Sequence, residues 1–470
     1  MANRPLCKFV VVCFLLLLGP ALVLSGQVRT TGLLSGTVVD ASGGVVASAT
    51  VTISQPTTGF SQTAVTNESG LYLFPALQPG TYQLRVSAKG FTEALLSDVV
   101  IGAGRTTDLR VELKVGQANE TVQVSTQGEV LETTSNTLSS TISPEDLQNL
   151  PLAGRDVLPF AQLVPGAQSG GDQRFTTYNA LPNAAINITV DGVNDNFQRY
   201  RTSTTGFYTA APLRLGAFDE VTVSTDSLTA DAGAEGSVQL RFVTKRGTNQ
   251  FHGSAFWQTQ NSALNANSYT NNALGLPISP FHLNDYGGSF GGPFWKNKLF
   301  FFINYEEEDN PFSITSSVLV PTPQAESGVF TYTGTDNAQH TVNLLTLAQA
   351  NGFPSVPNTI TSNIFSQING FAQNQTLTPV SGEPFLEQFS FFQRQSNTNR
   401  YPTARLDFQA TSKVALHASW DLYWRNIANT EPYPGDKNVN NGFKSTYYTA
   451  MIGADWTINP RLINQFNSAS

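Results

Sequence analysis

In the C-terminal half of the chain, apolar and polar residues alternate along several segments with a period of two. In residues 413–425 the even positions carry valine, leucine, alanine and tryptophan, and most odd positions, including His417 and Asp421, are polar. Residues 402–410 and 445–457 alternate in the same way. The pattern suits strands of about ten residues that cross an outer membrane with their apolar face toward lipid. A soluble antiparallel sheet shares this period, so alternation alone favours a membrane barrel only modestly.

The connections between these segments favour the membrane barrel more strongly. Long and short links alternate, as do the outer loops and periplasmic turns of an outer-membrane barrel. The same parity places Trp424, Tyr447 and Tyr448 near the outer rim and Trp456 near the inner rim, where aromatic girdles lie. The predicted strands are residues 251–260, 282–290, 298–306, 402–410, 413–425, 445–457 and a start at 461, with the longest link at residues 307–401.

Six strands and the beginning of a seventh cannot close into a barrel. An open edge in hydrocarbon would leave N–H and C=O groups unpaired, at a cost of several kcal/mol each. We therefore expect residues 247–470 to be an incomplete outer-membrane barrel and the chain to be a fragment of a longer protein.

Residues 1–26 have the order of a secretory signal peptide. Arg4 and Lys8 precede an apolar run at residues 9–18, and the small residues Ser25 and Gly26 close the segment. This apolar run is short for spanning about 30 Å of hydrocarbon, which favours a signal peptide over a membrane anchor. Both cysteines of the chain lie in this segment, so we expect the exported, cleaved protein to contain no thiol.

Composition narrows the class of the exported chain. Charged residues make up 13% of the sequence, against about 25% in an ordinary soluble protein. The net charge of −8 argues against nucleic-acid binding. The four histidines show no metal-ligand spacing and no catalytic motif is present, so we predict no metal, no cofactor and no enzymatic activity. The acidic run Glu306–Asp309 is expected in a solvated outer loop.

The N-terminal half predicts two further domains. Residues 32–115 contain about seven short strand patterns separated by turn residues, which is typical of a β-sandwich. Residues 117–246 predict an α+β domain, with a short helix capped by Ser143 and a turn at Asp191 and Gly192. The strands expected in this domain are residues 186–190, 221–224 and 237–245. The predicted fold is mainly β: a sandwich, an α+β domain and the first part of a large antiparallel transmembrane barrel.

Longer motifs resemble a known family. Residues 35–40, 66–72 and 77–82 resemble the carboxypeptidase-regulatory-like domain, which has a transthyretin-like, carbohydrate-binding-like fold. The order of the later motifs closely resembles that of TonB-dependent receptors of the Oar-like type, in which this domain precedes a plug and a large barrel. Residues 231–237 depart from the paired glycines usual in the family. The motifs are Asn149–Asp156, Leu163–Gly166, Ile188–Val193, Phe242–Ser254 and Tyr286–Phe294.

This resemblance implies a function and its partners. It implies that residues 117–246 plug the barrel of a transporter in the Gram-negative outer membrane, surrounded by outer-membrane lipid. The TonB energy-coupling protein would pull on a coupling segment, paired as an added strand, and admit an unidentified small nutrient, either a glycan-derived oligosaccharide or a siderophore. The coupling segment is Glu120, Thr121, Val122, Gln123 and Val124. The family-like plug motif is Leu150, Pro151, Leu152, Gly154, Arg155, Asp191 and Gly192.

Two alternatives remain open from the sequence. An exported adhesin or glycan-binding structural protein would use the sandwich and the long loops to bind surfaces, without transport. An extracellular glycosidase would need paired carboxylates in a cleft, which the sequence does nothing to support.

Overall fold

A computed structural model describes most of the chain beyond the expected export signal. The predicted signal peptide and residues 231–237 lie outside the described residues. The described residues are 30–116, 121–125, 138–142, 144–149, 154–168, 176–181, 186–196, 209, 211–226, 238–273, 275–434, 436, 441–459 and 462–469.

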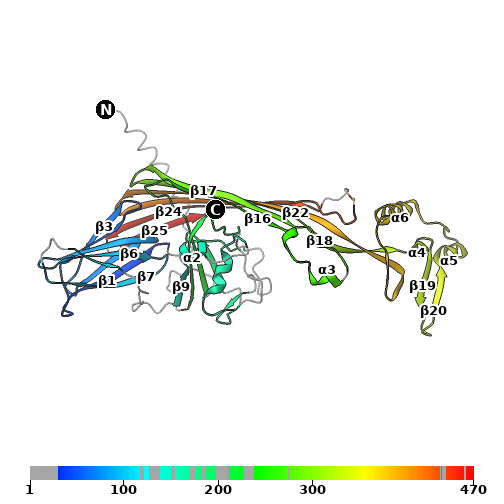
Figure 1. The fold of residues 1–470 in the computed structure, drawn as a ribbon, viewed down its shortest axis with the longest axis horizontal. Helices are drawn as coiled ribbons and strands as arrows, with labels where there is room; N and C mark the ends of the chain where they lie inside the picture. Colours follow the sequence, from blue (N-terminus) through cyan, green and yellow to red (C-terminus); the bar gives the residue numbers. More distant parts are fainter. Residues whose placement is uncertain are drawn as a thin grey trace, which may run out of the picture.

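The N-terminal unit is a β-sandwich (Figure 1, blue). Its strands are β1 (Gly32–Asp40), β2 (Thr50–Gln55), β3 (Phe60–Val65), β4 (Leu71–Leu77), β5 (Gly80–Ser87), β6 (Glu93–Ile101), β7 (Thr106–Leu113) and β8 (Thr121–Ser125). One sheet has the order β4-β1-β7 and the other β3-β2-β5-β6-β8. Alternation builds the core: β5 buries Tyr82, Leu84 and Val86 and turns the residues between them outward. The predicted sandwich is confirmed.

Strand β8 lies in the sandwich sheet, although the predicted domain boundary lies before it, at residue 117. It runs parallel to β6, with the register Glu93 to Thr121 through Ser97 to Ser125. Because β8 is at the end of the sheet order, it is an edge strand.

The middle unit is a mixed five-stranded sheet of order β13-β12-β15-β14-β9 with short helices. Its elements are β9 (Leu138–Ile142), α2 (Pro144–Asn149), η1 (Leu158–Leu163), β10 (Ala167–Gln168), β11 (Thr177–Tyr178), β12 (Ile186–Val190), β13 (Val193–Asn194), β14 (Phe218–Asp226) and β15 (Val238–Thr244). The central strand β15 is buried at every position because β12 and β14 flank it. The expected strands lie in β12, β14 and β15; Ser143, the expected helix cap, lies outside the described residues.

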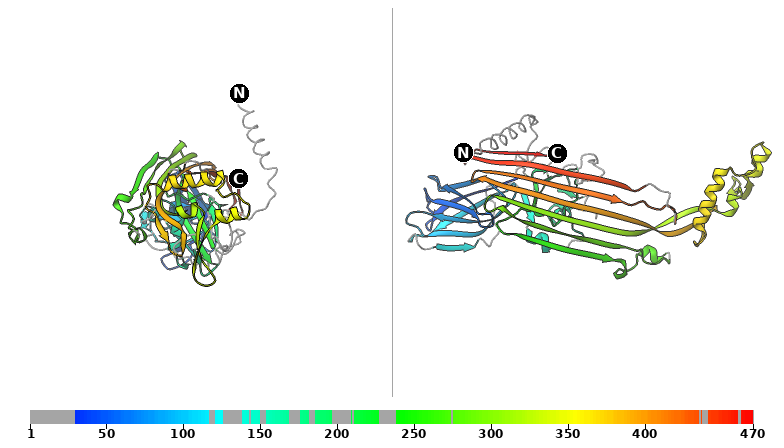
Figure 2. Two further views of the ribbon diagram at one scale, coloured as in Figure 1. Left: turned by 90° about the vertical axis from the view of Figure 1, so that its right-hand side faces the viewer. Right: turned by 90° about the horizontal axis from the view of Figure 1, so that it is seen from above.

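Long antiparallel strands in the C-terminal half form a curved sheet, which we call the wall (Figures 1 and 2). They follow the order β16-β17-β18-β22-β23-β24-β25. The strands are β16 (His252–Asn261), β17 (His282–Trp295), β18 (Leu299–Pro321), β22 (Glu383–Thr411), β23 (Val414–Ile427), β24 (Phe443–Asn459) and β25 (Leu462–Ala469). All seven predicted strands are present, and the short links join them at the end where the sandwich lies.

The predicted long link at residues 307–401 is mostly paired strand. Strands β18 and β22 continue together from Glu307 and Arg400 to Pro321 and Leu386, so that a two-stranded ribbon projects from the wall. The prediction was wrong here because it limited each strand to the length that crosses a membrane. The ribbon ends in a tip that contains α4 (Pro323–Glu326), β19 (Val329–Thr333), β20 (Gln339–Asn343), α5 (Leu344–Ala350), α6 (Thr359–Ala372) and β21 (Thr378–Val380).

Between β16 and β17 the chain forms η5 (Ser262–Leu264) and α3 (Tyr269–Ala273). Among the described residues, no helix is both long and apolar enough to cross a membrane.

Candidate functional site

The two faces of the wall differ in chemistry because successive side chains of a strand point to opposite sides. One face carries exposed apolar residues, among them Trp257, Phe290, Leu406, Trp420, Ile452 and Trp456. The opposite face, which we call the inner face, carries buried polar residues that contact the middle unit and the sandwich, among them Asp285, Glu306, Arg405, His417 and Asp455. The predicted assignment of faces in β22, β23 and β24 agrees with this exposure.

A buried ionic network joins the middle unit to the inner face. Glu306 of β18, which is 0% exposed, accepts hydrogen bonds from Arg155 Nε at 3.1 Å and Arg214 Nε at 3.2 Å. The backbone N–H of Gly216 donates to the same carboxylate at 2.9 Å. Arg214 also pairs with Asp285 of β17. Two guanidinium groups and a backbone amide thus converge on one carboxylate, which is charge-assisted bonding in a water-poor setting.

The surroundings of the Glu306 carboxylate leave no room for a side chain at position 216, and Arg155 beside it stacks on an aromatic ring. A Cβ added at Gly216 would lie 2.1 Å from Glu306 Oε1, so a side chain there would displace the bonded carboxylate. The guanidinium of Arg155 lies 3.5 Å from the ring centroid of Phe256 of β16, on the same face of the wall. The acidic run Glu306–Asp309 is therefore not a solvated loop cluster. It lies in β18, where alternation sends Glu306 inward and pairs Glu307 with Arg400 at 3.0 Å on the outer face.

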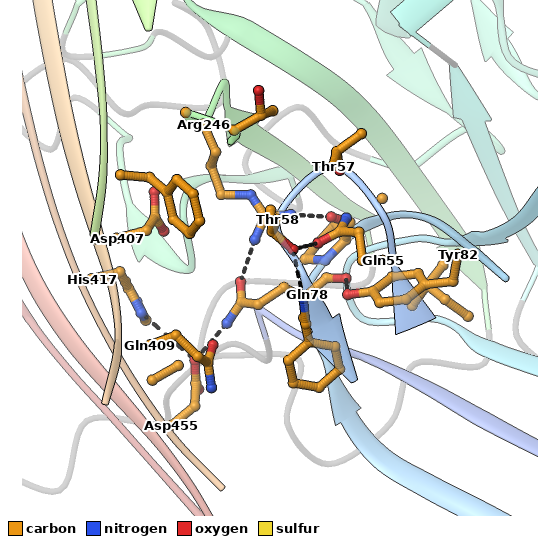
Figure 3. A pocket seen from close by; sticks show the side chains of 18 of the residues that line it. Gln55, Thr57, Thr58, Gln78, Tyr82, Arg246, Asp407, Gln409, His417 and Asp455 are labelled. Atoms are coloured by element: carbon orange, nitrogen blue, oxygen red, sulfur yellow. Dashed lines mark hydrogen bonds and ion pairs between the residues drawn. The ribbon is translucent and has the colours of Figure 1, made fainter. Parts of the chain in front are cut away.

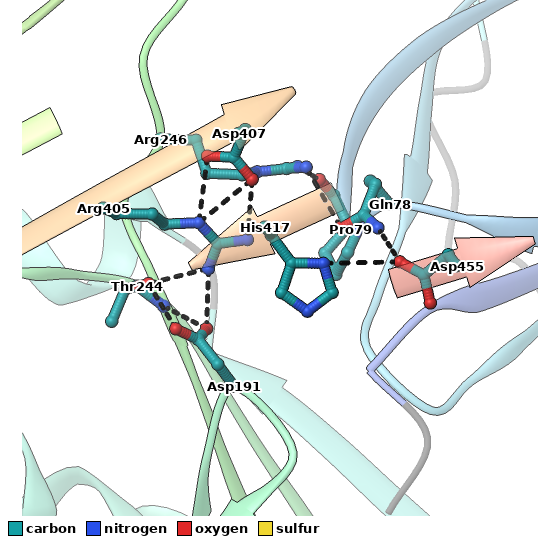
Figure 4. Close-up of polar contacts among 9 residues, drawn as sticks. All are labelled: Gln78, Pro79, Asp191, Thr244, Arg246, Arg405, Asp407, His417 and Asp455. Atoms are coloured by element: carbon teal, nitrogen blue, oxygen red, sulfur yellow. Dashed lines mark hydrogen bonds and ion pairs between the residues drawn. The ribbon is translucent and has the colours of Figure 1, made fainter. Parts of the chain in front are cut away.

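A second network lies nearer the short links (Figure 4). Asp191 sits in the turn after β12 with a φ of 47°, followed by Gly192 with a φ of 82°, so the predicted turn is confirmed. Its carboxylate accepts hydrogen bonds from the N–H and hydroxyl of Thr244 at 3.0 and 2.6 Å. Arg405 of β22 donates to Asp191 at 2.8 Å and to Asp407 at 3.0 Å. The turn residue is therefore also an anchor to the wall.

The sandwich contacts the wall through neutral groups more than through charges. Gln78, in the turn before β5, donates to Asp455 of β24 at 2.7 Å and accepts from Arg246 at 3.3 Å. His417 Nδ1 lies 3.6 Å from the same Asp455. Figure 4 shows Gln78 between the wall and Arg246. Arg246 lies in the connection between β15 and β16, which we call the linker. The backbone N–H of Asn249, also in the linker, donates to Thr57 O at 2.8 Å and so ties a second sandwich turn to the linker.

A cavity of about 310 Å³ lies among the three units (Figure 3). The sandwich lines it with Gln55, Thr58, Gln78 and Tyr82, the linker with Arg246, and the wall with Asp407, Gln409, His417 and Asp455. A cavity thus lies between the sandwich and the wall, whereas buried ion pairs connect the middle unit to the wall.

The sandwich also touches the middle unit at Glu220 of β14. The Glu220 carboxylate accepts hydrogen bonds from Ala103 N–H at 3.0 Å and from Thr222 Oγ1 at 2.7 Å. Burial raises the pKa of Glu220 above its ordinary value, and the two hydrogen bonds only partly oppose this rise.

The structure places the predicted site residues unequally. Arg155 and Asp191 both meet the inner face, on different strands, and a Cβ at Gly154 would meet no atom within 4 Å. Thr121, Val122, Gln123 and Val124 form most of β8 on the sandwich. Leu150, Pro151, Leu152 and Glu120 lie outside the described residues.

The sequence did not predict the partners in the network around Arg155. Arg155 binds Glu306, Glu306 also binds Arg214, and Arg214 binds Asp285. One usable signal was present: charged residues at inward positions of predicted barrel strands face the lumen, where a plug domain would contact them. Nothing in the sequence near Arg214 marked it as their partner.

Comparison with known proteins agrees with this architecture. Residues 243–469 match the family model for an outer membrane beta barrel domain, and residues 34–114 match that for a carboxypeptidase regulatory-like domain. The TonB-dependent transporter Oar of Myxococcus xanthus is 28% identical over 283 residues, which are 57% of this chain and 26% of Oar. The chain thus spans about a quarter of the length of this relative.

Two solved structures are similar in part. The outer membrane transporter YddB from Escherichia coli has a TM-score of 0.40 and 11% identity, over 68% of this chain and 36% of YddB. The siderophore receptor PirA from Acinetobacter baumannii has a TM-score of 0.32 and 15% identity, over 68% of this chain and 45% of PirA.

The sheet of long strands, with one apolar and one polar face, lies in the part of the chain that matches an outer membrane beta barrel domain, and the sandwich lies in the part that matches a carboxypeptidase regulatory-like domain. The chain is a homologue of the TonB-dependent transporter Oar, as its motifs predict. This relative is a transporter rather than an enzyme.

Proposed function

We propose that the protein is a TonB-dependent transporter in which the middle unit plugs a lumen bounded by the inner face of the wall. The observation that carries this proposal is the buried network of Arg155, Arg214 and Glu306, which fixes the middle unit against the polar face of a membrane wall. A soluble partner domain of an adhesin would have no need to be held on that face.

The proposal assigns residues 1–26 to a cleaved signal peptide, 32–115 to the sandwich, 117–246 to the plug and 247–470 to the barrel. The family matches at residues 34–114 and 243–469 support the assignments of the sandwich and the barrel. The substrate is a small nutrient, glycan-derived or of the siderophore type, that crosses when the plug moves.

The partner that moves the plug is a TonB protein that pairs with residues 120–124. The position of β8 at the edge of the sandwich sheet supports this role, because an edge strand offers backbone groups to another chain. Pulling on β8 would strain the link between the sandwich and the plug.

The occlusion half of the proposal is tested by loosening the plug in cells. The variant Arg155→Ala/Arg214→Ala leaves Glu306 without its guanidinium partners. Cells that carry this variant should become sensitive to vancomycin, a drug too large for intact outer membranes.

The matched control is Arg400→Ala, which removes a cation from the outer face of the same wall. Unchanged resistance in the loosened variant, or equal sensitivity in the control, would contradict occlusion by the middle unit.

The coupling half is tested by single cysteines at positions 120–124 in the otherwise thiol-free mature chain. We expect disulfide adducts with a TonB protein that carries a cysteine in its pairing strand. Cysteines at Ser61 and Thr63 of β3, the opposite edge of the same sheet, serve as controls. Adducts at β3 alone, or at neither edge, would refute the coupling role; an adhesin would give none.

A further inference from the structure

We infer that the inner face of the wall, just beyond the middle unit, binds a neutral saccharide through a row of three tyrosines. The inference rests on the proposed function and names the substrate class of that transporter. The tyrosine row consists of Tyr401 of β22, Tyr423 of β23 and Tyr447 of β24, on three neighbouring strands.

The three rings form a continuous stack. The centroids of Tyr401 and Tyr423 are 5.2 Å apart with an interplanar angle of 4°, and those of Tyr423 and Tyr447 are 6.0 Å apart at 18°. The row runs across the strands, because neighbouring strands lie about 4.8 Å apart. Tyr401 is buried at one end of the row, whereas Tyr423 and Tyr447 are half-buried and keep part of their surface accessible.

The row lies next to the described part of the middle unit. Arg214 of the middle unit lies 4.6 Å from the ring centroid of Tyr401. The preceding inward positions on β23 and β24, Asp421 and Thr449, still line a small cavity together with Leu213 and Arg214. Tyr423 and Tyr447 are the next inward residues toward the long connections, so a molecule resting on the middle unit would meet their rings.

Polar side chains follow the tyrosine row on the side of the long connections. Asn399 faces Arg425 in the β22–β23 register, and Arg425 faces Ser445 in the β23–β24 register. Tyr423 Oη donates to Asn399 Oδ1 at 3.4 Å. Within the described part of the chain, the buried oxygens Ser445 Oγ and Asn310 Oδ1 have no hydrogen-bond partner. Because the rings stack on one another, the row presents ring edges and hydroxyl groups. Hydroxyl and amide groups beside aromatic rings are the lining expected for a small polar ligand.

The charges around the row select a neutral ligand. The inner face around the row carries three cations, Arg155, Arg214 and Arg425, and four acids, Asp285, Glu306, Glu308 and Asp421, so it does not favour an anion. Arg155 and Arg214 are already bound to carboxylates, and Arg425 lies 5.4 Å from the ring centroid of Phe443. The neutral groups beside the rings are hydroxyls and amides, which match the hydroxyl groups of a sugar.

The test is calorimetric titration of the purified full-length protein in detergent with maltohexaose, cellohexaose and xylohexaose, and with ferric citrate as an anionic chelate. We expect at least one hexasaccharide to bind and ferric citrate not to bind. Tyr423→Ala and Tyr447→Ala should each weaken saccharide binding about tenfold, the loss of one aromatic contact. Tyr447→Phe should weaken it less, because the ring stays.

The matched control is Tyr448→Ala, which removes the neighbouring tyrosine from the outer face, where it is 61% exposed. Heat-modifiable migration on gels establishes that each variant is folded. Binding of ferric citrate alone, binding of no hexasaccharide, or an equal loss in Tyr448→Ala overturns the inference. These titrations need no TonB, so normal saccharide binding in a protein that fails the vancomycin and TonB tests would refute the proposed transport mechanism and leave this inference standing.

Discussion

The middle unit and the sandwich contact the same wall in different ways. The middle unit meets it through buried ion pairs, in which Glu306 is 0% exposed and Arg405 is held between Asp191 and Asp407. The sandwich meets it through single hydrogen bonds from turns, around a cavity of about 310 Å³. Removing one partner of a buried ion pair costs about 3–5 kcal/mol, whereas a hydrogen bond between a neutral amide and a charged group contributes about 1.5–3 kcal/mol. The comparison indicates that the sandwich is the easier of the two to detach.

The largest effect should come from the first network. Arg214→Met leaves Asp285 and Glu306 without their shared cation and should lower the free energy of unfolding by about 3–5 kcal/mol. Urea unfolding in detergent micelles, followed by tryptophan fluorescence, measures the change. Arg400→Met, at a half-exposed pair on the outer face, should cost no more than about 1 kcal/mol. Equal losses in the two variants would remove the distinction between the two faces of the wall.

The second network should be less sensitive, because Arg405 keeps Asp407 when Asp191 is altered. Asp191→Asn retains the turn residue's size but weakens its bond to Arg405, and we expect a loss of about 1–3 kcal/mol in the same urea experiment. A loss as large as that of Arg214→Met would show that Asp407 alone does not hold Arg405 in place.

A smaller effect is expected at the sandwich contact. Gln78→Ala removes the bonds to Asp455 and Arg246 and should cost about 1.5 kcal/mol, because Asp455 keeps Gln465 and Arg246 keeps Pro79 O as partners. Hydrogen exchange should rise in the sandwich turns before any change in the middle unit. Gln62→Ala on β3, away from the cavity, is the control. Simultaneous loosening of both units would contradict an independently detachable sandwich.

The smallest effect concerns pH. Since burial raises the pKa of Glu220, the folded protein holds that proton more tightly than the unfolded chain does. This stabilisation is present below the ordinary glutamate pKa and is lost as the pH rises through the raised value. Urea midpoints measured across that window should fall more steeply with pH in the native protein than in Glu220→Gln. Parallel curves would show that Glu220 does not report on this contact.

The strands were predictable where one short-range rule decides the side chain's environment. Alternation located every long strand of the wall, and turn residues such as Gly80, with a φ of 144°, marked the sandwich. The ribbon was missed because strands that leave the membrane need no apolar outer face, so their length is not limited by lipid. The acidic run was misassigned because neighbours in sequence were treated as neighbours in space.

The candidate site was harder to predict than the fold. Arg155 and Asp191 were found through resemblance, but their partners Glu306 and Arg405 lie 151 and 214 residues away in the sequence. Such pairings depend on how the middle unit packs against the wall. No local sequence pattern determines that packing. The one indication is that charged residues of the wall strands occupy inward positions.

The tip of the ribbon formed by β18 and β22 lies far from the ion-pair network around Glu306. Glu306 and Pro321 belong to one strand, and at about 3.3 Å per residue the tip stands roughly 50 Å from the ion-pair network. That reach exceeds the hydrocarbon thickness of about 30 Å. A molecule that contacts α5 or α6 therefore meets the chain at the far end of β18, the strand whose Glu306 binds Arg155 and Arg214 of the middle unit.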